Sequence, residues 1–232
     1  MQAVVLAGGL GTRLRPMTEK IPKCMAPVGG KPFLFYLLRL LWARGADEII
    51  LCTGYLGVQV EEYFGDGRDI GLKLSYSRET RTLLETGGAL KLAQPLLQER
   101  FLVVNGDTYL DVDYAAIYRE FSQSGAPALI VATPSSPNMR CDLAIDSHLL
   151  VTGYDKTNPT GLDYVNAGVM GLKREVLAAI MPGQPVSLET DVFPRLIERR
   201  QVRAHITDQR FYDIGSLSGL DSFEQLLSGG AA

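Results

Sequence analysis

The sequence predicts an α/β fold, a single domain with a Rossmann-like, mixed and mostly parallel sheet flanked by helices. Short apolar runs alternate with helical patterns over the first half of the chain, and a glycine-rich segment directly follows the first run. With 232 residues, 46% of them hydrophobic, the chain is long and apolar enough to bury a substantial core.

The first half of the chain supplies the alternation. Apolar or β-branched runs predict strands over residues 3–7, 48–53, 72–77, 101–105 and 128–133. Amphipathic stretches between them predict helices over residues 33–44, 57–64, 87–97 and 114–125. Because a strand–helix–strand crossover places successive strands in parallel, this order predicts a mostly parallel sheet wrapped by helices.

The second half of the chain is less regular. From Pro134 to Pro159 the sequence is polar and rich in turn residues. The remaining patterns predict strands over 142–146, 149–154, 164–172, 202–207 and 211–215, and helices over 174–181, 190–200 and 217–227. We interpret the irregular segment as an elaboration on one domain, which carries a second substrate.

The net charge and the cysteine content limit which partners and which location are expected for this protein. The formal net charge is -3 with both signs interspersed, which argues against a nucleic-acid surface. The three cysteines form no CxxC pair, so reduced thiols and a cytoplasmic location are expected. Neither an export leader nor a membrane span of ~18 apolar residues is found, so no membrane partner is expected.

The stretch AVVLAGGLGTRLRPMTEKIPKCMAP, from Ala3, has the composition of a phosphate-binding loop. Glycines allow backbone N–H groups to converge on anionic oxygens. The loop lacks the GxxxxGK[ST] pattern of P-loop proteins, and Leu14 stands where a dinucleotide fingerprint needs its third glycine. Arg13 and Lys23 lie beside the glycines, so the loop suits a nucleoside triphosphate.

This stretch resembles the signature GGxGTRLxPxTxxxPKxMxPVxxKP of the sugar-1-phosphate nucleotidyltransferases. The segments VVNGDTYLDVD, YVNAGVMGL and FYDIG extend the resemblance over nearly the whole chain. The strings ETGGALKLA and SLETDVFPRL look most like the short guanylyltransferases that activate D-glycero-D-manno-heptose 1-phosphate. The uridylyltransferases that activate N-acetylmuramate 1-phosphate are near neighbours of these.

The resemblance implies an enzyme that transfers a nucleoside monophosphate, most simply from GTP, to a sugar 1-phosphate and releases pyrophosphate. A uridylyltransferase, or an enzyme acting on N-acetylmuramate, mannose or glucose 1-phosphate, is the alternative, and a non-catalytic regulatory subunit is a third reading. A nucleotide-binding half over about 1–112, a sugar-binding half over about 113–228 and a flexible tail over 229–232 are expected, in a monomer or homodimer.

The resemblance also assigns the nucleotide site. Arg13, Lys23 and Asp107 are the expected catalytic residues, with Asp107 and Asp213 as ligands of Mg²⁺. Asp107 follows a central strand, where open α/β sheets bind ligands. The nucleotide-binding residues are expected to be Leu6, Gly8, Gly9, Gly11, Thr12, Arg13, Glu85, Gly87 and Gly88. We hypothesise that Glu85 accepts the two neighbouring N–H donors of guanine.

On the sugar side the resemblance implies three residues. Lys156 is expected to meet the phosphate of the sugar, and Asp155 its hydroxyls. Asn166 is expected to bind sugar hydroxyls, because its amide offers both a donor and an acceptor. Asp113 is expected to cap the helix that begins near Tyr114.

Overall fold

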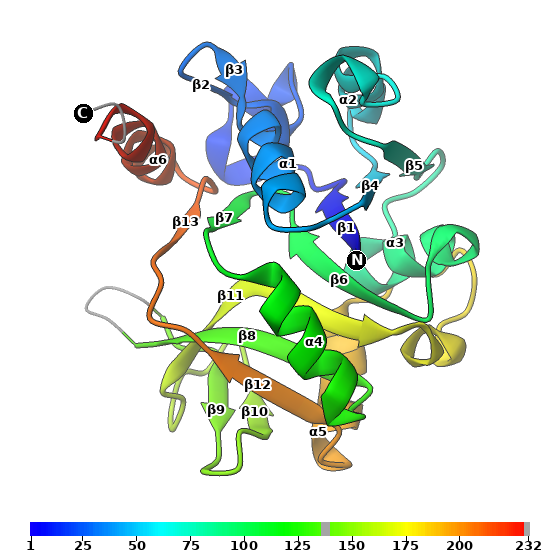
Figure 1. Ribbon diagram of the computed structural model, residues 1–232, viewed down its shortest axis with the longest axis vertical. Helices are drawn as coiled ribbons and strands as arrows, with labels where there is room; N and C mark the ends of the chain where they lie inside the picture. The colour runs from blue at the N-terminus through cyan, green and yellow to red at the C-terminus, as the bar shows by residue number, and fades with distance from the viewer. Residues whose placement is uncertain (136–139, 230–232) are drawn as a thin grey trace.

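The computed structural model describes residues 1–135 and 140–229. Within these ranges a nine-stranded sheet forms the centre of the molecule (Figure 1). Its strands are β1 (Gln2–Ala7), β4 (Glu48–Thr53), β5 (Leu74–Arg78), β6 (Arg100–Asn105), β8 (Ala128–Pro134), β9 (Leu143–Ile145), β10 (Val151–Tyr154), β11 (Tyr164–Lys173) and β12 (Val202–Ile206). The strand order is β10-β9-β11-β6-β1-β4-β5, with β8 paired to β11 and β12 paired to β8.

The sheet is parallel where the sequence alternates and mixed beyond it. β1 pairs in parallel with both β4 and β6, and β4 pairs in parallel with β5. The long strand β11 runs antiparallel to β6 and β8. The predicted fold class, a mixed and mostly parallel sheet flanked by helices, is confirmed.

Helices cover both faces of this sheet. They are α1 (Phe33–Ala43), α2 (Gly57–Phe64), α3 (Glu85–Ala93), α4 (Tyr114–Ser124), α5 (Phe193–Glu198) and α6 (Leu217–Gly229). α1 and α4 lie in front of the sheet in Figure 1, and α3 and α5 lie behind it. Short 3-10 turns span Thr12–Leu14, Met17–Glu19, Lys23–Met25, Arg68–Ile70, Gln94–Leu96 and Arg174–Ala179.

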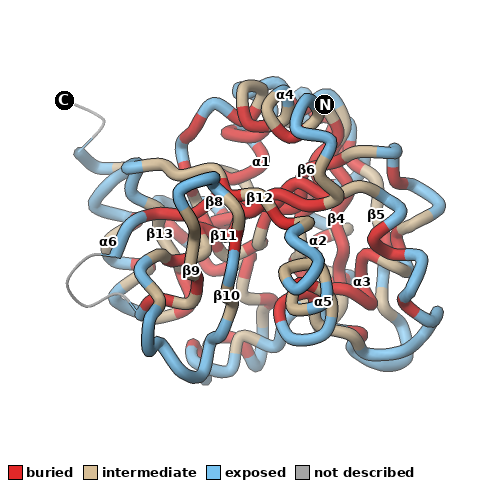
Figure 2. Tube along the Cα trace, turned by 90° about the horizontal axis from the view of Figure 1, so that it is seen from below, coloured by how far each residue is buried: buried red, intermediate tan, exposed pale blue. Residues whose placement is uncertain are grey.

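The core consists of two apolar layers, one on each face of the sheet. Successive side chains of a strand point to opposite faces. In β1, Val5 therefore packs with Leu38 of α1 in one layer, whereas Val4 packs with Leu90 of α3 in the other. Figure 2 shows the buried strands at the centre with exposed segments around them. Burial on both faces explains why β1, β4 and β6 read as continuous apolar runs.

Several helix boundaries differ from the expected ones. α3 begins at Glu85 rather than Gly87 and ends at Ala93, just before Pro95, which lacks the N–H that a helix interior needs. Residues 174–181 form a 3-10 helix over Arg174–Ala179 instead of an α-helix. A π-helical turn, Leu188–Val192, precedes the short α5.

The N-cap of α4 lies where the sequence predicts it, whereas α6 extends one residue into the predicted tail. The carboxylate of Asp113 accepts a hydrogen bond from the N–H of Ala116, so the predicted N-cap is confirmed. α6 includes Gly229, which the sequence assigned to the tail, and residues 230–232 of that predicted tail lie outside the described residues. Among the described residues, no helix combines the length and apolarity required to cross a bilayer.

Two small sheets accompany the main one. β2 (Pro27–Val28) pairs with β3 (Lys31–Pro32) ahead of α1. β7 (Thr108–Leu110) pairs antiparallel with β13 (Phe211–Asp213), which joins segments from the two halves of the chain. The sequence did not predict either pairing, because each strand is only two or three residues long.

Candidate active site

A cavity of about 500 Å³ opens at the carboxyl ends of β1, β4 and β6. These parallel strands end at the same edge of the sheet, which is where open α/β sheets bind ligands. The wall consists of the loop after β1, the residues that follow β6, and the start of α3. Its residues are Leu6–Thr12, Lys23, Cys24, Cys52, Glu79, Leu83, Glu85, Thr86, Ala89, Asn105–Asp107 and Glu189.

The glycine-rich loop presents bare backbone to this cavity. A side chain on Gly9 would have no atom within 4 Å, so this position faces open space. Gly11 has a φ of 61°, and a Cβ there would lie 2.9 Å from side-chain atoms of Lys23 and Thr18. In the described part of the chain, the N–H groups of residues 9–11 donate no hydrogen bond to protein acceptors. They are available for anionic oxygens.

Two glycines of the cavity wall offer a matched test of fold against ligand binding. A Cβ on Gly106 would lie 2.6 Å from the carbonyl oxygen of Leu6, so Gly106→Ala is expected to cost about 1–3 kcal/mol of unfolding free energy. Gly9→Ala is expected to change that free energy by less than about 0.5 kcal/mol and yet to weaken nucleotide binding. Denaturant unfolding and nucleotide titration of both variants measure this contrast, and equal stability losses would contradict it.

Asp107 and Asp213 lie together although half the chain separates them. Asp107 directly precedes β7, and in the ladder between β7 and β13 Asp213 is the partner of Thr108. The N–H of Ile214 also donates to the carbonyl oxygen of Asp107, at 3.0 Å. The ladder therefore brings Asp213 next to Asp107, which lines the cavity.

One lysine bridges these two carboxylates. Lys23 Nζ forms an ion pair with Asp107 Oδ2 and lies 3.7 Å from Asp213 Oδ1. Its side chain is 13% exposed, so the ammonium is held largely out of water. Because both acids approach one cationic nitrogen, they are close enough to act on one cation.

Arg13 completes this charged cluster. Its Nη2 lies 3.6 Å from Asp213 Oδ2, and its side chain is 67% exposed. Gly215 lacks a side chain at the point where a Cβ would collide with the Arg13 guanidinium. Arg13 does not belong to the cavity wall in this structure, but its exposed side chain directly follows Thr12, which does.

The donor set fits a hard divalent cation. Mg²⁺ commonly takes one or two carboxylates, with phosphate oxygens and water as its other ligands. Asp107 and Asp213 supply that number, and no cluster of three or more potential metal-ligating side chains occurs among the described residues. A cation here would therefore depend on a phosphate ligand to complete its coordination.

The cysteines of the cavity wall are poor nucleophiles. Burial raises the pKa of the Cys24 thiol to about 12. Burial likewise raises the pKa of the Cys52 thiol to about 12. Both thiols stay protonated at neutral pH, and a thiol reacts as its thiolate. The chemistry of the cavity therefore rests on cations and carboxylates.

A third wall of the cavity runs from Glu79 to Ala89 and carries two carboxylates. Glu79 Oε2 accepts the N–H of Leu84 at 3.1 Å, and partial burial raises the pKa of Glu79 despite this bond. Glu85 lines the cavity with a φ of 59° at the start of α3. The sequence analysis missed Glu79, which lies at the end of a strand without a local motif of its own.

Gly87 and Gly88 differ from their expected role. They are absent from the wall of the cavity, and the N–H groups of both donate to the carbonyl oxygen of Val186, at 2.8 and 3.0 Å. A Cβ on Gly88 would lie 2.6 Å from the carbonyl oxygen of Gln184. These glycines make room for the segment 184–186 to pack on α3, and the structure does not present them to a nucleobase.

The sugar-side residues divide into two groups. Lys156 Nζ lies 3.3 Å from Glu189 Oε1, which belongs to the cavity wall. Asp155 Oδ1 accepts hydrogen bonds from the N–H groups of Thr157 and Asn158 and from the hydroxyl of Thr157. Asp155 Oδ1 therefore shapes the turn that carries Lys156, and the sugar-hydroxyl contact expected of Asp155 stays a prediction.

Asn166 sits in a β-bulge of β11. The pairing of β11 with β8 shifts register between Asn166 and Met170, and Asn166 Oδ1 accepts the N–H of Gly168 at 2.9 Å. Asn166 Nδ2 donates to the hydroxyl of Tyr154 at 2.8 Å. The backbone N–H of Asn166 donates to Asp142 Oδ1, and burial raises the pKa of Asp142. One amide N–H and one oxygen lone pair of Asn166 remain available to a ligand.

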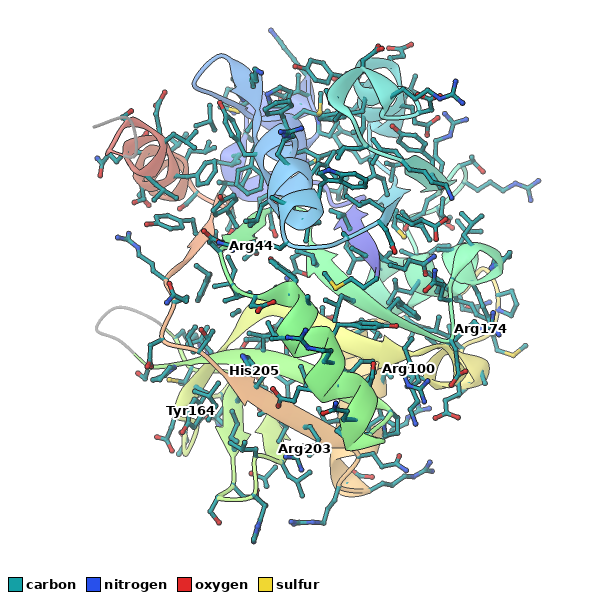
Figure 3. All side chains as sticks on the ribbon, viewed as in Figure 1. Arg44, Arg100, Tyr164, Arg174, Arg203 and His205 are labelled. Atoms are coloured by element: carbon teal, nitrogen blue, oxygen red, sulfur yellow. The ribbon has the colours of Figure 1, made fainter. Side chains whose placement is uncertain are left out.

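The structure thus brings most of the expected residues to one place. Those that line the cavity are Leu6, Gly8, Gly9, Gly11, Thr12, Lys23, Glu85 and Asp107. Asp213 joins through Lys23, Arg13 joins through Asp213, and Lys156 joins through Glu189. The histidines lie elsewhere. His148 is in the turn after β9, and His205 Nδ1 lies 2.6 Å from Glu120 Oε2 on the surface near α4 (Figure 3).

Known proteins match this chain over its length. Residues 2–228 match the nucleotidyl transferase family. A D-glycero-alpha-D-manno-heptose 1-phosphate guanylyltransferase of Aneurinibacillus thermoaerophilus is 32% identical over 216 residues, 93% of each chain. A mannose-1-phosphate guanylyltransferase of Mycobacterium tuberculosis is 35% identical over 199 residues, and the match spans 85% of this chain but only 55% of that relative.

Solved structures agree with the sequence comparisons. The crystal structure of HddC from Yersinia pseudotuberculosis complexed with GMP-PN superposes with a TM-score of 0.83 at 29% identity, covering 97% of this chain and 99% of that one. The family match and these relatives define a sugar-1-phosphate nucleotidyltransferase. The chain belongs to the nucleotidyl transferase family.

Proposed function

We propose that the protein transfers GMP from GTP to D-glycero-D-manno-heptose 1-phosphate, releasing pyrophosphate and forming a GDP-sugar. The observation that carries the choice of GTP is that two carboxylates, Glu79 and Glu85, line the cavity beside the glycine-rich loop. Guanine presents two neighbouring N–H donors on its N1 and exocyclic amine, which suit a carboxylate. Uracil presents one N–H between two carbonyl oxygens, and these two oxygens are repelled by a carboxylate.

The reaction needs no activated nucleophile from the protein. An oxygen of the sugar phosphate attacks the α-phosphorus of the nucleotide, the new P–O bond forms, and the bond to the pyrophosphate breaks on the opposite side. The nucleophile is already an anion, so the protein must align two anions that repel each other and neutralise charge on the leaving group. Lys23 supplies a cation held between two carboxylates, Arg13 supplies an exposed one, and residues 9–11 supply backbone N–H donors.

Asp107 and Asp213 would hold a divalent cation, most simply Mg²⁺. When bound, such a cation neutralises developing charge on phosphate oxygens. In the described structure Lys23 lies between the two carboxylates and offsets part of their charge, and Arg13 pairs with Asp213. Lys156 and Asn166 are then the residues proposed to bind the sugar phosphate and the sugar hydroxyls, with the monomer or homodimer as the proposed assembly.

Two relatives of nearly the same length support a heptose 1-phosphate substrate. The heptose 1-phosphate guanylyltransferase of Campylobacter jejuni is 31% identical over 93% of this chain and 95% of its own length. An N-acetylmuramate alpha-1-phosphate uridylyltransferase of Neisseria meningitidis is 34% identical over 81% of this chain, so a uridylyltransferase is the second candidate. Glucose and mannose 1-phosphates remain the other candidate substrates.

A substrate matrix tests the proposal. Pyrophosphate release is measured for GTP, UTP, dTTP, ATP and CTP against the 1-phosphates of manno-heptose, mannose, N-acetylmuramate and glucose, with and without Mg²⁺. The highest kcat/KM is expected for GTP with the heptose phosphate, and EDTA is expected to abolish turnover. A preference for UTP would contradict the guanylyl assignment while leaving the reaction class intact. No release with any pair would favour a non-catalytic role.

The Glu85→Gln variant tests whether Glu85 recognises the nucleobase. Glu85→Gln replaces a charged acceptor with an amide that offers one acceptor and two donors. The kcat/KM with GTP is expected to fall about tenfold, the range of a lost hydrogen bond to a charged group, while the value with UTP holds or rises. Glu62→Gln, an exposed acid on α2, is the control. An unchanged GTP/UTP ratio would dispose of Glu85 as the base-reading residue, and Glu79→Gln then becomes the informative variant.

A further inference from the structure

Glu189 is a buried carboxylate on the cavity wall to which the proposed mechanism gives no task. It lies in the π-helical turn Leu188–Val192, and its side chain is 8% exposed. Leu188, beside it, is fully buried and anchors the turn in the core. An acid is almost never buried this far unless it is paired. Glu189 therefore needs partners that stabilise its charge.

Both carboxylate oxygens of Glu189 are engaged, on opposite sides. Oε2 accepts the hydroxyl of Thr86 at 2.7 Å and the hydroxyl of Ser187 at 3.0 Å. Oε1 faces Lys156, whose Nζ lies 3.3 Å away. Thr86 belongs to the start of α3 beside the proposed base-reading Glu85, so one carboxylate links the nucleotide wall to Lys156.

The charges of Glu189 and Lys156 favour a stable ion pair between them. Burial alone would raise the pKa of Glu189, but Lys156 and the hydrogen bonds from Thr86 and Ser187 outweigh it, so the pKa is lowered and the group is ionised at neutral pH. Lys156 is half exposed, and its Nζ also lies 5.9 Å from the ring centroid of Tyr154 and near enough to Asp142 to act on the charge of that carboxylate. Without Glu189, this long and flexible side chain would lose the ion pair that it makes within residues 1–135 and 140–229.

We propose that Glu189 is a positioning residue for the sugar phosphate, because it holds Lys156 Nζ at the cavity and fixes it relative to Thr86 on the nucleotide side. This inference rests on the proposed function, in which Lys156 binds the phosphate of the sugar. Asp155, next to Lys156 in the chain, binds the turn instead. The acid that acts on Lys156 comes from a segment 33 residues later.

A double-mutant cycle tests the proposal. Lys156→Met, Glu189→Gln and the double variant are compared by the KM values for the sugar 1-phosphate and for GTP. Each single variant is expected to raise KM for the sugar phosphate about 10- to 100-fold, the range of a charge-assisted contact, with KM for GTP within twofold. If Glu189 acts through Lys156, the double variant matches Lys156→Met alone, because neighbours that act as one unit are not additive.

The outcomes separate this inference from the proposed function. A Lys156→Met variant with an unchanged KM for the sugar phosphate would overturn the assigned role of Lys156, and this inference with it. A raised KM for Lys156→Met with a normal one for Glu189→Gln, or effects that multiply in the double variant, would overturn only the role of Glu189. Asp191→Asn is the matched control, because Asp191 is exposed on the same turn and accepts the N–H of Ser187 at 2.8 Å without reaching Lys156.

Two variants of Thr86 test the same link from the nucleotide side, and they remain informative if Glu189→Gln does not fold. Thr86→Val removes the hydroxyl that donates to Glu189, and Thr86→Ser keeps it. A general weakening of the site would affect both substrates. Positioning predicts that Thr86→Val raises KM for the sugar phosphate about fivefold, whereas Thr86→Ser restores the wild-type value. Equal behaviour of the two variants would count against the link.

Discussion

Asparagine at Asp107 or Asp213 is expected to lower kcat by about 100- to 1,000-fold, the range seen when one group that stabilises transition-state charge is removed. Both carboxylates contact Lys23, and both are proposed to hold the divalent cation. Asparagine keeps the shape of the side chain and removes its charge. Pyrophosphate release at saturating substrates measures the effect, and the double variant is expected to lose little more than either single one, since the two groups serve one cation.

Metal-linked stability gives this prediction a second readout. A ligand that binds only the folded state stabilises it and raises the melting temperature, by an amount that grows with the logarithm of the ligand concentration above Kd. Mg²⁺ with GTP is expected to stabilise the wild-type protein, and either asparagine variant is expected to lose the part that depends on Mg²⁺. Asp111→Asn is the control, because Asp111 follows β7 and pairs with Arg44 on the surface, at 2.6 Å. Wild-type turnover in Asp213→Asn would show that the Asp213 carboxylate is not needed for catalysis.

Replacing Arg13 with alanine is expected to lower kcat/KM by about 100-fold or more, the range for a lost charged contact to a transferring phosphoryl group. Arg13 is 67% exposed and contacts Asp213, so its removal leaves the core intact. Lysine is expected to recover only part of the activity, because an ammonium lacks the planar fork that meets two phosphate oxygens at once. Steady-state kinetics with GTP and the sugar phosphate measure both variants.

Arg15 supplies the control for Arg13. It is an exposed arginine two residues later in the same loop and lies outside the cavity wall. Arg15→Ala is expected to stay within about twofold of the wild-type kcat/KM, as surface substitutions away from a site do. Matching losses in Arg13→Ala and Arg15→Ala would mean that the loop needs positive charge in general and no particular guanidinium.

The sequence carries local features well. Continuous apolar runs identified β1, β4 and β6, because a strand buried on both faces needs no polar alternation. The short polar side chain of Asp113 marked the start of α4. Gly9 and Gly11 marked a loop that approaches a ligand or bends through positive φ. In each case the physical cause lies within a few residues of the signal.

The amino-acid sequence is enough to predict the alternating strands and helices of the main sheet, the phosphate-binding character of the loop after β1, and the family. Which distant groups meet depends on the folded structure. The ladder between β7 and β13 sets Asp213 beside Asp107, and a π-helical turn places Glu189 against Lys156. Gly87 and Gly88 likewise pack against residues 184 and 186, which lie much later in the chain. These contacts arise from register and packing between segments far apart in the chain, and such contacts leave no periodic pattern in the residues around them.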